Sequence, residues 1–181
     1  MAGLAGQYED EGYDGVYLDN VDAYTVLEEK QPSWAQGVDL RSEMIRLIAD
    51  IRAGTSGLIY INLGGALEDL NGGVELLGTV DGVLREEILY YSTGTCTNRP
   101  GSPATALEQL FILARARAAG LDVLVVEFVH PGPQALIAGL THTLLGLHPI
   151  LQPACSPDYT QPPIILGAPK PGSNTLNPHP Q

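Results

Sequence analysis

The chain alternates short runs of β-branched and apolar residues with longer stretches whose apolar positions recur every three to four residues. The short runs predict strands at residues 16–19, 58–63, 81–86, 122–129 and 150–154. The periodic stretches predict helices at 39–52, 103–118 and 133–145, with a weaker one at 70–77. This alternation predicts an α/β fold with a parallel sheet covered by helices, either a doubly wound sheet or a barrel.

Each expected helix carries an apolar stripe that predicts its buried face. Ser102 is a suitable N-cap and Pro103 a suitable first residue for the second helix. The expected stripes comprise Met44, Ile45, Leu47, Ile48 and Ile51 in the first helix, Leu107, Leu110, Phe111, Ala114 and Ala118 in the second, and Leu136, Ile137, Leu140 and Leu144 in the third.

Three of the expected strands share one pattern, in which an Asp at the start precedes an acid five residues later. The segments are DGVYLD at 14–19, DGVLRE at 81–86 and the looser DVLVVE at 122–127. Because strand side chains alternate between faces, we expect Asp19, Glu86 and Glu127 to point to one interior side. Val16, Leu18, Leu124 and Val126 would then face the helices.

Catalytic groups of (β/α)8 barrels lie at the carboxyl ends of the strands, where these acids are expected. Asn62 ends the second strand at the same level. The competing interpretation is structural, because an acid after a strand can also cap the next helix or pair with an arginine. Asp14, Asp81 and Asp122, at the opposite strand ends, are expected to be structural turn residues.

Composition narrows the functional classes. The 181 residues carry a net charge of −12, which argues against a nucleic-acid-binding surface. No dinucleotide or P-loop motif and no HExxH spacing occurs, so we expect neither cofactor nor metal. No apolar run reaches the ~18 residues of a membrane span, and residues 1–11 do not resemble a signal peptide. Cys96 and Cys155 fit a disulfide or two free thiols equally well.

Three segments resemble one known family. The stretch GYDGVYLDNVDAY at 12–24 is similar to the G-[FY]-D-G-[VI]-[FY]-[LI]-D-x-[VL]-D signature of glycoside hydrolase family 114, the endo-α-1,4-polygalactosaminidase-like proteins. VDGVLREE at 80–87 resembles its second segment, and 122–129 resembles a later strand. In that strand the family often has Asp-Tyr where this chain has Glu127-Phe128. The resemblance covers roughly residues 8–155.

The resemblance implies a TIM-type (β/α)8 barrel of which this chain supplies about the last five strand–helix units. Residues 1–155 would form that portion, and the proline-rich 156–181 an irregular tail. It further implies hydrolysis of an α-1,4-linked galactosamine polysaccharide, with Asp19 as nucleophile and Glu86 as general acid/base on a retaining pathway. Asp22 is the rival to Asp19, and Glu87 is the rival to Glu86.

The expected sugar contacts are Asp22, Tyr24, Asn62, Tyr91 and Glu127. Relatives in this family are largely secreted, which implies an extracellular location for a full-length relative. About three amino-terminal units of the barrel are expected to be missing, so the chain alone is expected to be inactive. A silent carbohydrate-binding remnant and an interaction module built from the half-barrel are the alternatives.

An open barrel predicts self-association, because unpaired strand edges and an uncovered apolar face favour pairing with another copy. We expect size-exclusion chromatography of the isolated chain to show oligomers, or thermal melting to show marginal stability. A monomer that melts cooperatively within or above the usual range of ~45–65 °C would contradict this expectation.

Overall fold

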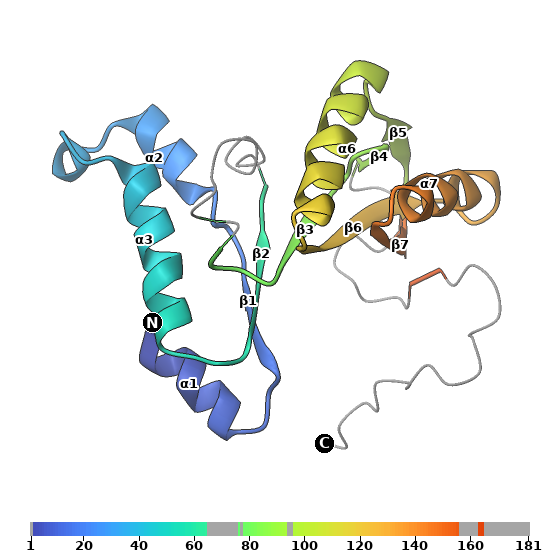
Figure 1. Ribbon diagram of the computed structural model, residues 1–181. Coiled ribbons are helices and arrows are strands. Elements are labelled where there is room, and N and C mark those ends of the chain that lie inside the picture. Colours follow the sequence, from blue (N-terminus) through green and yellow to red (C-terminus); the bar gives the residue numbers. More distant parts are fainter. Residues whose placement is uncertain (1, 65–75, 77, 94–95, 156–162, 165–181) are drawn as a thin grey trace.

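The computed structural model describes residues 2–64, 76, 78–93, 96–155 and 163–164 (Figure 1). Most of the weakly predicted helix at 70–77 and most of the tail at 156–181 therefore lie outside the described residues. Within the described part, the predicted α/β fold is confirmed: strands and helices alternate, and five of the strands form one parallel sheet.

The sheet contains five strands in the order β1-β2-β3-β6-β7, which is also their order along the chain. They are β1 (Gly15–Leu18), β2 (Leu58–Asn62), β3 (Gly82–Glu86), β6 (Asp122–Val129) and β7 (His148–Pro153). Every neighbouring pair is parallel. A doubly wound sheet reverses its strand order at a switch point, whereas a barrel adds each new strand beside the last. The observed order is that of a barrel.

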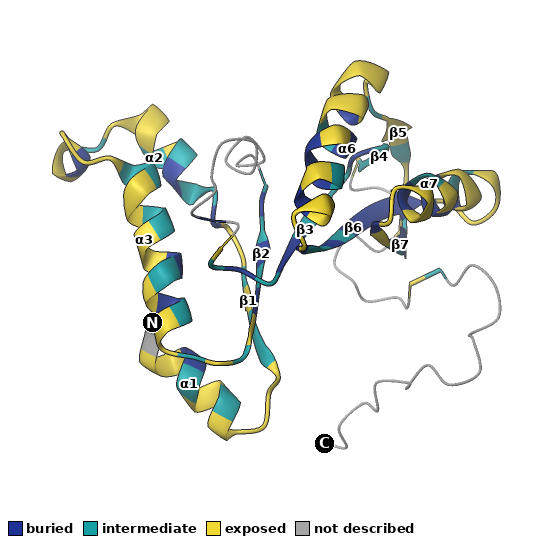
Figure 2. Ribbon diagram, viewed as in Figure 1, coloured by how far each residue is buried: buried dark blue, intermediate teal, exposed yellow. Residues whose placement is uncertain are grey.

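Three helices follow the strands as the sequence predicts: α3 (Leu40–Ala53), α6 (Pro103–Ala118) and α7 (Pro133–Leu144). Asp39 caps α3, since its carboxylate accepts a hydrogen bond of 3.0 Å from the Ser42 amide. The helix-facing side chains of the sheet, among them Ile61, Val83 and Val125, are fully buried and pack in one cluster with Ile51 of α3 and Leu113 of α6. Figure 2 shows this buried interior as dark blue along β6.

Several elements were not predicted. Two are the helices α1 (Ala2–Asp10) and α2 (Ala23–Lys30), with a short 3-10 turn at Ser33–Ala35. The others are β4 (Tyr90–Ser92) and β5 (Asn98–Pro100), which form a separate antiparallel hairpin between β3 and α6. Three-residue strands are too short to show a two-residue period, which is why the hairpin leaves no clear pattern in the sequence.

The predicted buried stripes of α6 and α7 are largely wrong. In α6, Leu107 and Phe111 are 71% and 65% exposed, and in α7 Leu144 is 84% exposed. The buried sets are Ala106, Leu110, Ile112, Leu113 and Ala116 in α6, and Ala135, Ala138, Gly139 and His142 in α7. Apolar residues recur at helical spacing on both faces of α7. The face with small residues lies against the sheet, because small side chains let the helix approach the strands closely.

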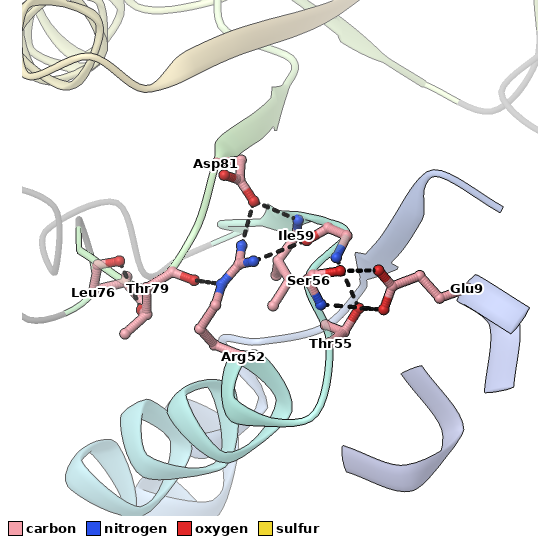
Figure 3. Close-up of polar contacts among 9 residues, drawn as sticks. Glu9, Arg52, Thr55, Ser56, Ile59, Leu76, Thr79 and Asp81 are labelled. Atoms are coloured by element: carbon pink, nitrogen blue, oxygen red, sulfur yellow. Dashed lines mark hydrogen bonds and ion pairs between the residues drawn. The ribbon is translucent and has the colours of Figure 1, made fainter. Parts of the chain in front are cut away.

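The amino-terminal edge of the sheet is held by a polar network around Arg52 (Figure 3). The guanidinium donates to the carbonyls of Thr79 at 2.9 Å and Gly57 at 2.8 Å, and it forms an ion pair with Asp81. Asp81 also accepts a 2.8 Å hydrogen bond from the Ile59 amide. The expected structural role of Asp81 therefore has a concrete form, since one carboxylate joins α3, β2 and the start of β3.

A second contact in Figure 3 attaches α1 to the loop between α3 and β2. Glu9 accepts hydrogen bonds from the hydroxyl groups of Ser56 and Thr55, and from the Ser56 amide at 3.1 Å. These hydrogen bonds, that from Ser56 first, lower the pKa of Glu9. The Glu9 carboxylate therefore stays charged at lower pH than the carboxylate of an isolated glutamate, and it continues to accept these hydrogen bonds there.

We expect Arg52→Ala to lower the free energy of unfolding by about 2 kcal/mol, because it removes one ion pair and leaves two carbonyls without their donor. Urea denaturation followed by circular dichroism measures this change. The control is Arg46→Ala in the same helix. Arg46 is 73% exposed and lies 3.8 Å from Glu43, so its loss should cost within about 0.5 kcal/mol. Equal effects of the two substitutions would show that the network does not stabilise the sheet edge.

Candidate active site

A cavity of about 570 Å³ opens at the carboxyl ends of the strands, on the face of the sheet opposite the helices. All five strands or the turns directly after them contribute lining residues, which are Tyr17, Asp19, Asn20, Asn62, Leu84, Glu86, Val126 and Ile150. The strand pairing explains why these side chains lie together, because Glu86 is level with Val126, and Val126 is level with Ile150. Paired residues of a parallel sheet point to the same face, so these side chains converge.

Asp19 and Asn62 form the polar contact at one side of the cavity. Asp19 follows β1, and its Oδ1 accepts hydrogen bonds from the Asn20 amide at 2.9 Å and from Asn62 Nδ2 at 3.1 Å. Asn62 Oδ1 accepts a bond of 3.2 Å from the Gly64 amide, which fixes which end of the side-chain amide faces Asp19. Asn20 has a φ of 55°, a left-handed conformation that asparagine tolerates well.

Tyr17 lies among these groups. Burial raises the pKa of Tyr17 to about 12, and the charges of Asp19 and Glu86 act in the same direction. A side-chain hydrogen bond with Asn62 acts the opposite way. The phenol is therefore neutral over the physiological range and keeps a proton to donate. The sequence motif at 14–19 could have placed Tyr17 in this cavity, because strand alternation puts Tyr17 on the same face as Asp19.

Glu86 and Glu87 point to different places, as strand alternation predicts. Glu86 is the last residue of β3 and lines the cavity. Glu87 has a φ of 60°, and its amide donates to the Val126 carbonyl at 2.8 Å. Its carboxylate accepts a 2.7 Å bond from the amide of Ser92 in β4. Glu87 thus anchors the hairpin next to the cavity.

The prediction that Glu127 shares the face of Asp19 and Glu86 is wrong. Gly82, not Asp81, pairs with Asp122, so β6 is shifted by one residue relative to the motif of β3. The shift turns Leu124 and Val126 toward the cavity side and Glu127 toward the helices, with Val125. A one-residue change of register exchanges the faces of every side chain in a strand.

Glu127 is instead a fully buried acceptor. It accepts hydrogen bonds of 2.8 Å from His142 Nε2 and 2.8 Å and 2.9 Å from the amides of Leu89 and Tyr90. Three donors from two other segments compensate the removal of the carboxylate from water. Glu127 therefore ties β6 to α7 and to the start of the hairpin.

Three further predicted sugar contacts are not among the cavity-lining residues of the described part. Asp22 lies beside Gly64, where an added Cβ would come within 2.1 Å of Asp22 Oδ2. Tyr24 is buried in α2 with 8% exposure. Tyr91 lies in β4, with the Arg99 guanidinium 5.8 Å from its ring centre. Asp22 is thus in the loop after β1, whereas the two tyrosines pack within the structure.

The described residues hold neither a metal cluster nor a membrane-spanning helix. Among them, no group of three or more His, Cys, Asp or Glu side chains is arranged to hold a metal ion. Across the same ranges, no helix combines the length and the apolar character that crossing a membrane requires.

Sequential parallel strands, helices on one face and carboxylates at the carboxyl edge define a section of a (β/α)8 barrel. The solved glycoside hydrolase domain of PelA from Pseudomonas aeruginosa is similar to the chain, with a TM-score of 0.65 at 17% identity. A glutamate-to-alanine variant of that domain gives a TM-score of 0.62 at the same identity. Both comparisons cover 86% of this chain and 59% of the solved chain.

This likeness shows the fold: the predicted barrel-type α/β fold is confirmed, and the chain spans about three-fifths of the solved domain. No family model matches the chain. No curated protein matches it either.

We expect Glu127→Gln to lower the free energy of unfolding by about 3 kcal/mol. The NH2 group that replaces one carboxylate oxygen is itself a donor, so it cannot accept the hydrogen bond that the buried oxygen accepted. Chemical denaturation measures the loss. Glu108→Gln is the matched control on the exposed face of α6 and should change stability by no more than about 0.5 kcal/mol. A Glu127→Gln protein of unchanged stability would contradict the structural role assigned to this carboxylate.

Proposed function

We propose that this chain carries the catalytic carboxylates of a glycoside hydrolase that acts on an α-1,4-linked galactosamine-type polysaccharide. The observation that carries the proposal is the meeting of Asp19 and Glu86 in one cavity at the carboxyl edge of a barrel-type sheet. The fold shared with a solved glycoside hydrolase domain supports the reaction class. The family 114 resemblance of the segment at 12–24 supports the substrate class.

In the proposed mechanism Asp19 is the nucleophile. Its hydrogen bond from Asn62 holds one carboxylate oxygen, which leaves the other to attack the anomeric carbon. Glu86 donates a proton to the leaving oxygen and then removes one from the incoming water. A retaining pathway of this kind requires the two carboxyl groups to lie ~5–5.5 Å apart. Tyr17, neutral at physiological pH, offers a hydrogen-bond donor next to both carboxylates.

Charge supports the proposed substrate. The chain has a net charge of −12, and a galactosamine polymer with free amino groups is cationic near neutral pH. Opposite charge raises the local concentration of substrate and its rate of association, and salt screens the effect. Asp22, in the loop after Asp19, is the carboxylate that we assign to a sugar amine.

A second candidate is carbohydrate binding without turnover. It would be favoured if this part of a barrel alone forms the cleft, since the chain spans 59% of the solved domain and β1 lies at the edge of the described sheet. A cleft built by only part of a barrel contacts its ligand from fewer sides. Binding tolerates this loss better than catalysis, which needs the reacting groups positioned to within fractions of an ångström.

The test compares four variants, each made in the full-length protein that the gene encodes. The measurement is the rate at which new reducing ends are released from an α-1,4-linked galactosamine polymer. Asp19→Asn and Glu86→Gln should each lower turnover on the order of 10²–10⁴-fold, because they remove the attacking anion and the transferable proton. Asp22→Asn should mainly weaken binding. Glu87→Gln should have a mild effect, because that side chain faces the hairpin.

Binding of oligosaccharides, measured by calorimetry on the same proteins, separates the two candidates. Binding with no turnover in any variant would select the second function. An active Glu86→Gln protein beside an inactive Glu87→Gln protein would overturn the assignment of the acid/base. Absence of both binding and turnover would exclude this substrate class.

A further inference from the structure

The two cysteines of the chain come together at the carboxyl edge of the sheet. Cys96 lies in the turn of the β4–β5 hairpin, and Cys155 lies two residues after β7. They are 59 positions apart in the sequence, and both are exposed free thiols. Sequence alone left their relation open.

Contacts with the backbone of β6 bring the two segments to the two sides of the same strand end. In β5, Asn98 donates from Nδ2 to the Phe128 carbonyl at 2.7 Å. After β7, the Ala154 amide donates to the Val129 carbonyl at 3.0 Å. Phe128 and Val129 are consecutive residues at the end of β6, so each cysteine lies within two residues of an anchor on the same strand end. The hairpin lies beside this end of the sheet in Figure 1.

The side chains of the two cysteines interact. The interaction with the Cys96 thiol raises the pKa of Cys155. The contact requires the sulfur atoms to be neighbours, which is the first condition for a disulfide.

The local backbone at Cys96 gives an independent reason. Cys96 has a φ of 56°, a conformation that glycine or asparagine would adopt at lower cost. The turn is closed around it by the Thr93 amide, which donates to the Thr97 carbonyl at 3.0 Å. A strained backbone conformation persists where the surrounding structure holds the residue in place. For Cys96, the interaction with the Cys155 side chain is such a constraint.

We propose that Cys96 and Cys155 form an intramolecular disulfide that fastens the β4–β5 hairpin to the end of β7. The oxidant is a low-molecular-weight disulfide such as oxidised glutathione. The Cys96 thiolate attacks one of its sulfurs, which forms a mixed disulfide and releases one reduced glutathione. Cys155, after losing its proton, attacks the Cys96 sulfur and releases the second. Two thiols are oxidised, and one glutathione disulfide is reduced to two thiols.

The bond would brace one wall of the cavity. The hairpin holds Glu87 through the Ser92 amide, directly after Glu86, and β7 supplies Ile150 to the cavity lining. The disulfide closes a loop of about 60 residues, for which loop-closure entropy predicts a rise in Tm on the order of 10 °C. Reduction would release the hairpin from β7 without unfolding the sheet.

The experiment treats the whole chain with oxidised glutathione and measures free thiols, intact mass, the cross-linked peptide and Tm. We expect both thiols to disappear, the mass to fall by two hydrogen atoms, and one peptide to join Cys96 to Cys155. Tm should exceed that of the reduced chain by on the order of 10 °C. Cys96→Ser and Cys155→Ser each leave one cysteine, which should form a glutathione adduct, and each variant should lose this difference in Tm.

Three results would overturn the inference. One is a chain that carries two glutathione adducts and no internal cross-link. Another is a disulfide-linked dimer as the main product. The third is an internal cross-link with an unchanged or lower Tm, which would show that the bond does not brace the cavity wall. Because both positions are exposed, the serine variants should fold as the parent does.

Discussion

The register of the parallel strands is the constraint on which this structure depends. Each strand hydrogen-bonds to the next one along the chain, and the pairing decides which side chains are level and which face they share. Side chains that face the helices form an apolar core around Ile61, Val83 and Val125. The opposite face receives the polar groups of the cavity. One residue of slippage in any strand would exchange these two environments, so the core fixes the register and the register fixes the site.

Buried and exposed carboxylates take two different roles in this structure. Glu127 is fully buried and has three donors, so its charge is used to join β6, α7 and the hairpin. Asp19 lies at an exposed strand end beside the neutral phenol of Tyr17, and within the described residues its Oδ1 accepts hydrogen bonds from the Asn20 amide and Asn62. A carboxylate that holds structure is saturated with donors, whereas one that reacts must leave an oxygen accessible. The surroundings, not the residue type, separate the two roles.

The hairpin between β3 and α6 connects the core to the candidate site. Glu127 accepts from the amides of Leu89 and Tyr90 at its start, and Glu87 accepts from the Ser92 amide. Asn98 fastens its second strand to the end of β6. The contacts from Glu127 act on the backbone amides of Leu89 and Tyr90, whereas the other two use the side chains of Glu87 and Asn98. The proposed disulfide would add a covalent connection to β7 at the far end of the same hairpin.

The sequence by itself determined the alternation of strands and helices, the parallel sheet and the placement of Asp19, Asn62 and Glu86 at strand ends. Those features follow from local periodicity, which depends on residues within one element. The tertiary structure decided the direction of Glu127 and the buried faces of α6 and α7. The three acids share a motif, but only the pairing of Gly82 with Asp122 shows that β6 is offset by one residue. Likewise, α7 has two faces of helical spacing, and contact with the sheet selects the one with small residues. Register and helix rotation are set by neighbours distant in the chain, which no local pattern records.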